Sequence, residues 1–293
     1  MILRHSKCCF PALLPALLLA GAFTFTTAEE DKAADASPEL QIVWQKNILT
    51  VSGDFPGGTL DIWYLEAYCR PGSTDRDWNE TVIKHETTLK RASADHREID
   101  LECRLADGVV VNHAIRATEG GITFNITASN PTDKNSEAHW AQPCIRVGTF
   151  TGTGEDTHPD DRYAYLEKSF LFVDGKLERM PTKRWAVSAL YEPGQVWCPE
   201  HVSRDDVNPR PLSPIVPSNG LIGCFSKDET HLMAVAFEPY QELFQGVIRC
   251  LHSDFRVGGL APGEKKTIHG KLYLMKADVQ ELLETYANDF PQS

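Results

Sequence analysis

The sequence predicts an all-β fold, in which two antiparallel sheets form one large sandwich that ends in a short helix. Three observations lead to this prediction. From Leu40 onward, short runs of β-forming residues alternate with turn signals roughly every ten residues, which is typical of all-β domains. The run Leu232–Phe237 is continuously apolar, as in a strand that is covered on both faces. Only the segment that follows Asp278 has a helical pattern.

Residues 1–28 have the composition of a secretory signal peptide. Basic residues precede an apolar stretch at 10–25, and small residues follow it at 26–28, as at a signal-peptidase cleavage point. The apolar stretch is shorter than the ~20 residues that a membrane-spanning helix needs. Residues 29–39 are acidic and rich in alanine, which predicts a flexible leader. We therefore expect a secreted or periplasmic protein with no membrane insertion.

The chain is acidic. Its 293 residues carry a formal net charge of −12, and losing the two positive charges of Arg4 and Lys7 with the signal makes it −14. Such a surface repels phosphate backbones and anionic lipids, so nucleic acid and membranes are poor partners and neutral or cationic ligands remain. The sequence does not indicate an oligomeric state.

Six cysteines are expected to remain in the exported chain. An even number of cysteines in an exported protein predicts disulfides, although their pairing does not follow from the sequence. Buried free thiols are the alternative, because an unpaired cysteine behaves as a small hydrophobic residue. The six are Cys69, Cys103, Cys144, Cys198, Cys224 and Cys250.

Residues 40–277 are predicted to form a single β domain. Asp107-Gly108 and Asp174-Gly175 are typical hairpin turns. The proline-rich stretch 202–217 predicts a long loop that serves as a rim or a lid. Strands are expected at residues 41–51, 60–68, 80–89, 97–105, 109–117, 123–129, 166–173 and 185–191.

The domain is expected to close with one more strand and a helix. Alternation from Ile268 to Leu274 predicts the strand, and Gly270 within it is expected to mark a bulge. Asp278 and Glu281 form a capping box, which predicts a helix in the final segment, residues 278–293. Its apolar stripe is expected to dock at the edge of a sheet.

Several common chemistries are excluded by the motifs. The sequence has no Gly-x-Ser-x-Gly elbow, no P-loop and no Cys-x-x-Cys pair, and we predict no cofactor. Residues 198–201 and 250–252 each offer cysteine and histidine, but neither has the spacing of a zinc site, so no metal is predicted. Glu238 ends the buried strand, where desolvation raises the pKa of a carboxyl group toward neutral pH. It is therefore the first candidate for catalysis.

Two stretches resemble motifs of the galactose mutarotase-like (aldose 1-epimerase-like) family. In residues 130–147, a turn leads to His139-Trp140, where the family has a sugar-binding histidine followed by an aromatic residue. Residues 236–241, Ala-Phe-Glu-Pro-Tyr-Gln, match the family's strand with a catalytic glutamate, and 260–264 match the turn that follows it. The chain is thereby identified as a divergent member, and the resemblance extends over about residues 40–275.

The resemblance implies an antiparallel supersandwich with a sugar cleft across one sheet. It implies that Glu238 is the general base that takes the proton of the anomeric hydroxyl group, while an acid protonates the ring oxygen. The family's second histidine, its general acid, has no counterpart at the matching position, and His158 in a nearby loop is the substitute candidate. The implied sugar-binding residues are His139, Trp140, Arg70 and Gln241.

Three functions fit this interpretation. The first is an isomerase that acts on a sugar hemiacetal with Glu238 as general base. The second is a carbohydrate-binding protein without catalysis, which the missing second histidine favours. The third is a structural or interaction domain of an extracellular assembly, for which the acidic, proline-rich loop is the indication. For the first two functions, Glu238 and His139 are expected to contact the same small ligand.

Overall fold

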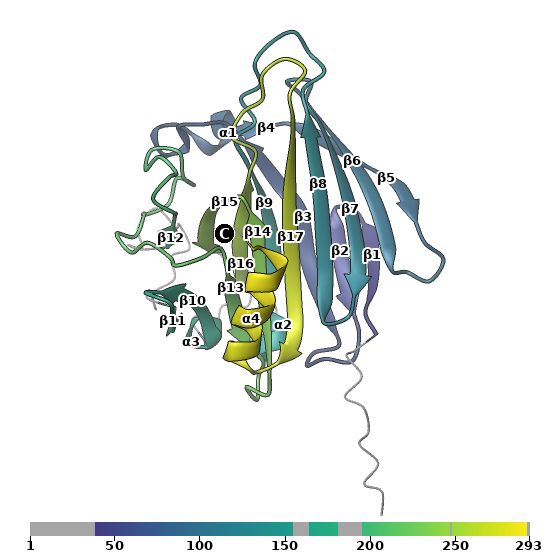
Figure 1. The fold of residues 1–293 in the computed structure, drawn as a ribbon, viewed down its shortest axis with the longest axis vertical. Helices are drawn as coiled ribbons and strands as arrows, with labels where there is room; N and C mark the ends of the chain where they lie inside the picture. Colours follow the sequence, from purple (N-terminus) through teal and green to yellow (C-terminus); the bar gives the residue numbers. More distant parts are fainter. Residues whose placement is uncertain (1–38, 155–163, 181–194, 247, 292–293) are drawn as a thin grey trace, which may run out of the picture. The chain divides into compact units, whose positions relative to one another are not determined.

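The computed structural model describes residues 39–154, 164–180, 195–246 and 248–291. These residues belong to one compact unit, residues 37–293. They form mainly strands in two large antiparallel sheets with a short C-terminal helix, which confirms the predicted all-β fold (Figure 1). In this part of the chain, no helix is long and apolar enough to cross a membrane. The predicted signal peptide and the strand expected at 185–191 lie outside the described residues.

The first sheet has eight strands among the described residues. The segment 41–51, expected as one strand, is a hairpin, because Lys46 and Asn47 adopt positive φ angles of 51° and 64° and reverse the chain. Such angles suit asparagine in a two-residue turn. The spatial order is β1 (Gln41–Gln45), β2 (Ile48–Ser52), β3 (Thr59–Cys69), β9 (Trp140–Arg146), β16 (Cys250–Arg256), β15 (Tyr240–Gln245) and β12 (Val196–Trp197), and β4 (Val82–Ile83) also pairs with β3.

The second sheet has nine strands in the described part of the chain. Both predicted hairpin turns are confirmed: Asp107-Gly108 joins β6 to β7, and Asp174-Gly175 joins β10 to β11. The spatial order is β11 (Lys176–Arg179), β10 (Ser169–Val173), β13 (Ile222–Phe225), β14 (His231–Glu238), β17 (Lys265–Lys276), β8 (Gly121–Ser129), β7 (Val110–Thr118), β6 (Glu98–Leu105) and β5 (His85–Ala92).

Short helical segments replace parts of two expected strands. The 80–89 prediction covers the end of α1 (Trp78–Thr81), β4 and most of β5, and the 166–173 prediction covers the end of α3 (Ala164–Lys168) and β10. A 3-10 turn, η1 (Ser73–Asp75), precedes α1, and α2 (Gly148–Thr151) follows β9. η1 and α1 connect β3 to β4 within the eight-stranded sheet, whereas α2 and α3 lie between β9 of that sheet and β10 of the other.

The main core lies between the two sheets. The central strand β14 explains why residues 232–237 are continuously apolar. Its alternate side chains, which include Val235 and Phe237, pack in the core between the sheets, whereas Leu232, Ala234 and Ala236 pack on the opposite face against a second apolar cluster. Both faces of β14 are therefore covered, as the apolar run predicted.

Helix α4 (Val279–Asp289) covers that second face. Asp278 caps it by accepting hydrogen bonds from the backbone N–H groups of Gln280 and Glu281. Leu282, Tyr286 and the following Phe290 pack with the outward side chains of β13, β14 and β17. The expectation that the helix docks at a sheet edge is wrong, because β14 and β17 lie inside the nine-stranded sheet (Figure 1).

Gly270 does not mark a bulge. Strand β17 keeps a continuous register with β14 and with β8 through this position, so the prediction is wrong. Gly270 stands opposite Phe237, and a Cβ at residue 270 would clash with the Phe237 ring. The glycine is therefore required by close packing of a core aromatic ring rather than by a break in pairing.

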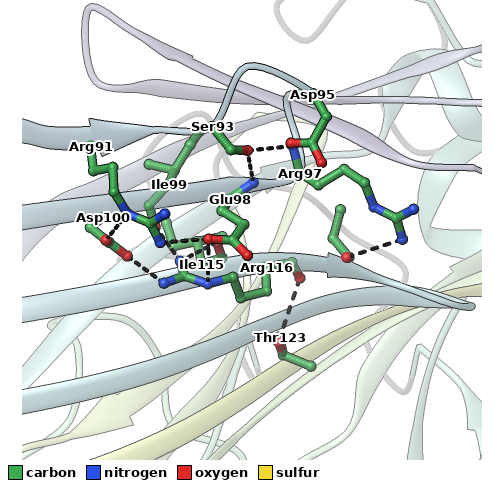
Figure 2. Close-up of polar contacts among 11 residues, drawn as sticks. Arg91, Ser93, Asp95, Arg97, Glu98, Ile99, Asp100, Ile115, Arg116 and Thr123 are labelled. Carbon is green, nitrogen blue, oxygen red and sulfur yellow. Dashed lines mark hydrogen bonds and ion pairs between the residues drawn. The ribbon is translucent and has the colours of Figure 1, made fainter.

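The outer face of β5, β6 and β7 is lined by charged pairs. Figure 2 shows that Asp100 lies between two guanidinium groups: its Oδ2 is 2.7 Å from Arg91 Nε, and its Oδ1 is 2.7 Å from Arg116 Nη2. Glu98 also pairs with both arginines. These side chains are 26–50% exposed, so solvent screens each pair and its contribution to stability is small. Their main effect is to keep this face of the sheet polar.

All six cysteines of the described chain are free thiols, and all are buried. The predicted disulfides are therefore absent from this structure, and the alternative of buried thiols is confirmed for the described residues. Cys103 and Cys224 lie in the apolar core between the sheets, where burial raises the pKa of each thiol. Such thiols act as small core side chains.

A polar cluster inside the core joins the two sheets. His113 of β7 lies between two tyrosine hydroxyl groups of β3: its Nδ1 is 3.0 Å from Tyr64 Oη, and its Nε2 is 3.0 Å from Tyr68 Oη. All three side chains are at most 1% exposed. Both ring nitrogens of His113 are thus engaged in a place where an unpaired polar group is costly.

Candidate functional site

The outer face of the eight-stranded sheet carries a buried set of polar side chains. In β16, the positions that point away from the core alternate with Leu251 and Phe255, which point into it. Their four side chains are all titratable, and three of them are fully buried. The four are Cys250, His252, Asp254 and Arg256. A buried titratable stripe of this kind is where a functional site is expected.

A long loop covers this face. Within the predicted loop 202–217, Val202 and Val207 pack with Phe244 of β15 and with the short strand β12. The backbone N–H of Asn208 donates to Glu242 Oε2 at 2.8 Å, which fixes the loop over the sheet. The loop therefore shields the polar stripe from solvent.

Two carboxyl groups meet under the loop. Glu242 of β15 and Asp254 of β16 stand opposite each other in register, and both are 0% exposed. Burial raises the pKa of Glu242 to about 8 and also raises the pKa of Asp254, which the neighbouring Glu242 raises further. Apart from their contact with each other, Glu242 Oε1 and both Asp254 oxygens have no hydrogen-bond partner among the described residues. The pair therefore retains a proton at neutral pH.

A partly exposed network lies beside this buried pair. His139 Nδ1 is 3.0 Å from Asp206 Oδ2, and Arg256 Nη1 is 3.3 Å from the same oxygen. The side-chain amide of Gln241 donates to the backbone oxygen of Asp206 and accepts from Arg256. His139 and Arg256 are each 23% exposed, and Asp206 is 7% exposed. We name these four residues the rim network.

A cavity of about 370 Å³ borders the rim network through Arg256. Gly259 also lies close to the rim network, because a Cβ built on Gly259 would be 3.2 Å from His139 Nε2. The rim network thus contacts an open space, while the carboxyl pair next to it is closed. The lining residues are Pro239, Arg256, Val257, Gly258, Lys266, Thr267 and Ile268.

Glu238 lies in a different environment. It ends β14 in the nine-stranded sheet, and its Oε1 accepts a hydrogen bond of 2.8 Å from the Tyr286 hydroxyl group of α4. Burial raises the pKa of Glu238, and the hydrogen bond from Tyr286 lowers it by less. The chain enters the other sheet at Tyr240, so Glu238 and Gln241 belong to different sheets. No described contact joins Glu238 to His139.

The remaining predicted residues have structural partners. Trp140 is fully buried, packs against Trp78 with ring centroids 6.4 Å apart, and places its indole Nε1 3.3 Å from Ser73 Oγ. Arg70 donates to Glu137 at 3.2 Å and to the backbone oxygen of Val82 at 2.9 Å. His158 lies outside the described residues. Of the predicted set, the structure brings together His139 and Gln241.

Sequence reasoning missed Asp206, Glu242, Asp254 and Arg256. The sequence did contain a signal for Asp254 and Arg256. In β16, every second residue is titratable (Cys250, His252, Asp254 and Arg256), and the residues between them are mostly apolar. Glu242 carried no such signal, because a register shift between Tyr240 and Glu242 breaks the alternation of β15. Asp206 belongs to the irregular loop, where the sequence has no periodic pattern.

No protein-family model matches this sequence, and no curated protein matches it. Solved structures resemble it in fold. A putative aldose 1-epimerase from Escherichia coli K12 is 11% identical with a TM-score of 0.42, over 82% of this chain and 100% of the other. A galactose mutarotase-like protein from Lactobacillus casei is 10% identical with a TM-score of 0.41, over 80% and 99%. Another from Clostridium acetobutylicum is 10% identical with a TM-score of 0.40, over 83% and 99%.

All three similarities have TM-scores below 0.5. Because the identities are so low and a fold hosts many functions, they assign no role to any residue of this chain.

Proposed function

We propose that this protein binds a carbohydrate at the rim network, and that it is exported with removal of residues 1–28. The observation that carries the proposal is the rim network itself: four polar side chains are held by one another, and one of them, Arg256, lines an open cavity. A sugar offers many hydroxyl groups, each of which donates and accepts hydrogen bonds. A site with several fixed donors and acceptors in a concave space meets that requirement.

The charge of the site also favours an uncharged polar ligand. Arg256 is paired with Asp206, and Lys266 donates to the backbone oxygens of Val257 and Gly259 at 3.1 and 2.7 Å. The two cations that line the cavity are thus already engaged with protein acceptors. The formal net charge of −12 adds a long-range repulsion of anions.

Replacing His139 with alanine is expected to weaken sugar binding at least about tenfold, because it removes one hydrogen bond to the ligand and one of the two side chains that hold Asp206 Oδ2. A panel of neutral mono- and oligosaccharides is screened by isothermal titration calorimetry, and the tightest sugar is titrated into both proteins. His231→Ala is the control, since His231 lies at the start of β14 and bonds Thr230. Equal affinity of the His139 variant and the wild-type protein would refute the rim site.

Aldose 1-epimerase-like activity with Glu238 as general base is a second candidate. The observation that favours it is the raised pKa of Glu238, caused by burial, together with a hydroxyl proton donor 2.8 Å away on Tyr286. A carboxylate and a hydroxyl group side by side offer a base and an acid, which the opening of a hemiacetal requires. In this arrangement the chemistry takes place at α4 and not at the rim network.

Polarimetry of freshly dissolved α-glucose and α-galactose tests this candidate. If Glu238 is the base, the protein accelerates the change in optical rotation, and Glu238→Gln loses about a hundredfold or more of the acceleration. The glutamine has the same shape and still accepts a hydrogen bond from Tyr286. No acceleration by the wild-type protein leaves the non-catalytic binding function.

A further inference from the structure

Three metal-ligating side chains meet on the outer face of the eight-stranded sheet. Cys144 lies on β9, and Cys250 and His252 lie on the adjacent strand β16. One ligand atom from each residue lies within 4.8 Å of the other two, and Cys250 Sγ is 3.2 Å from His252 Nε2. The three side chains are only 1–2% exposed. None of them belongs to the rim network or contacts Glu238.

We propose that Cys144, Cys250 and His252 bind a zinc ion. Two thiolates and one imidazole are a ligand set that zinc prefers. With metal–sulfur bonds of about 2.3 Å and metal–nitrogen bonds of about 2.1 Å, tetrahedral coordination places the ligand atoms roughly 3.6–3.8 Å apart. The distance from Cys250 Sγ to His252 Nε2 is 3.2 Å and no pair of ligand atoms is more than 4.8 Å apart, which is compatible with this value. The site therefore needs only small side-chain adjustments to hold the ion.

The second nitrogen of His252 supports this assignment independently. Its Nδ1 is buried and has no hydrogen-bond partner among the described residues. The nearest acidic atom is Asp254 Oδ1, at 3.7 Å. A metal-bound histidine characteristically turns its other nitrogen toward a carboxylate, which fixes the ring and its tautomer. His252 has this arrangement, with Nε2 directed at the sulfur atoms and Nδ1 at Asp254.

A carboxyl group interacts with one of the three ligands. The carboxyl group of Glu66 on β3 accepts a hydrogen bond from the Cys144 thiol. When zinc binds, each thiol loses its proton to solvent and forms a metal–sulfur bond, so two protons leave for one divalent ion. A water molecule is then expected to complete a four-coordinate site, because the carboxyl group of Glu66 is not among the convergent ligand atoms. The resulting negative charge is offset by Arg146 and Arg210, whose charges act on Glu66.

Sequence spacing does not indicate this site. Cys250 and His252 are separated by a single residue, a spacing unlike that of zinc motifs, and Cys144 comes from another strand more than a hundred residues earlier. Pairing of β9 with β16 brings the three together. A disulfide between Cys144 and Cys250 is the alternative. A disulfide does not explain why His252 directs Nε2 at Cys250 Sγ and Nδ1 at Asp254.

Metal content tests the proposal. Protein purified in the presence of a mild reductant is analysed by inductively coupled plasma mass spectrometry, and a single zinc ion per chain is expected. Protein refolded with Co²⁺ in place of zinc is expected to show thiolate-to-cobalt charge-transfer absorption and the intense d–d bands of tetrahedral cobalt. Cys144→Ser and Cys250→Ser are expected to lose zinc, while Cys224→Ser, which changes a buried thiol in the other sheet, keeps it.

Three results would overturn the proposal. Zinc-free protein that takes up no added zinc, or a cobalt spectrum without thiolate charge transfer, rules out the site in the wild-type chain even if the serine variants fail to fold. A Cys144–Cys250 disulfide found by peptide mass spectrometry of the alkylated protein also refutes it. Sugar binding at the rim network does not depend on these outcomes.

Discussion

Replacing His113 with alanine is expected to lower the free energy of unfolding by about 3–5 kcal/mol. The imidazole ring is the shared partner of two buried hydroxyl groups, those of Tyr64 and Tyr68, at 3.0 Å each. Its loss leaves both hydroxyl groups without this partner inside the core, at about 1–3 kcal/mol each, and opens a cavity between the sheets. Urea denaturation followed by tryptophan fluorescence measures the change.

The pH dependence of stability provides a second test of His113. Burial and, to a smaller extent, the charge of the neighbouring His85 together lower the pKa of His113 to about 3. The unfolded chain binds a proton near pH 6.5 whereas the folded protein does not, so stability falls as the pH drops below about 6.5 toward 3. At pH 4.5 this costs about 2–3 kcal/mol.

Two variants separate these effects. His113→Gln is expected to keep part of the hydrogen bonding to Tyr64 and Tyr68. Because glutamine does not titrate, the variant is also expected to lose the part of the acid-induced destabilisation that His113 causes. His231→Ala serves as a control, because His231 is partly exposed and bonds its neighbour Thr230. A loss below about 1 kcal/mol for His113→Ala would contradict the role of the cluster in joining the sheets.

Replacing Trp140 with alanine is expected to destabilise the protein by about 3–5 kcal/mol. The indole ring is fully buried and packs with Ala67, Cys69 and Trp78, and its Nε1 lies within hydrogen-bond distance of Ser73. A ring so enclosed offers no face on which a sugar can stack. The variant is therefore expected to lose stability, and to lose sugar binding only in proportion to the unfolded fraction.

Trp63 on β3 is the matched control for this prediction. Its side chain is among the exposed large hydrophobic groups, at 37% exposure, so Trp63→Ala is expected to cost less stability than Trp140→Ala. Differential scanning calorimetry of both variants measures the stabilities, and calorimetric titration measures the affinities. A Trp140→Ala protein that keeps its melting temperature but loses sugar binding would show that the ring contacts the ligand.

Most of the framework could be predicted from the sequence. Turns such as Asp107-Gly108 and the cap at Asp278 are set by local chemistry, and the structure contains both. The two-sided burial of β14 was predictable because a short apolar run without alternation is typical of a strand covered on both faces. The bulge predicted at Gly270 was wrong, since what requires glycine there is the ring of Phe237, thirty-three residues away in the chain.

The candidate site was less accessible to sequence reasoning, because it depends on which strands become neighbours. Resemblance pointed to His139 and Gln241, and Asp206 joins them. The same resemblance pointed to Glu238, but its strand lies in the other sheet and its partner is Tyr286. The carboxyl pair of Glu242 and Asp254 exists only through the register of β15 with β16.

The location of a bound sugar tests most directly whether the rim network is the binding site. A crystal structure of the protein in complex with the tightest neutral sugar found by calorimetry would provide that location. We predict sugar density in the cavity beside Arg256, with hydroxyl groups within hydrogen-bond distance of Arg256 or His139. Sugar density against Glu238 and Tyr286, with an empty cavity at Arg256, would contradict binding at the rim network.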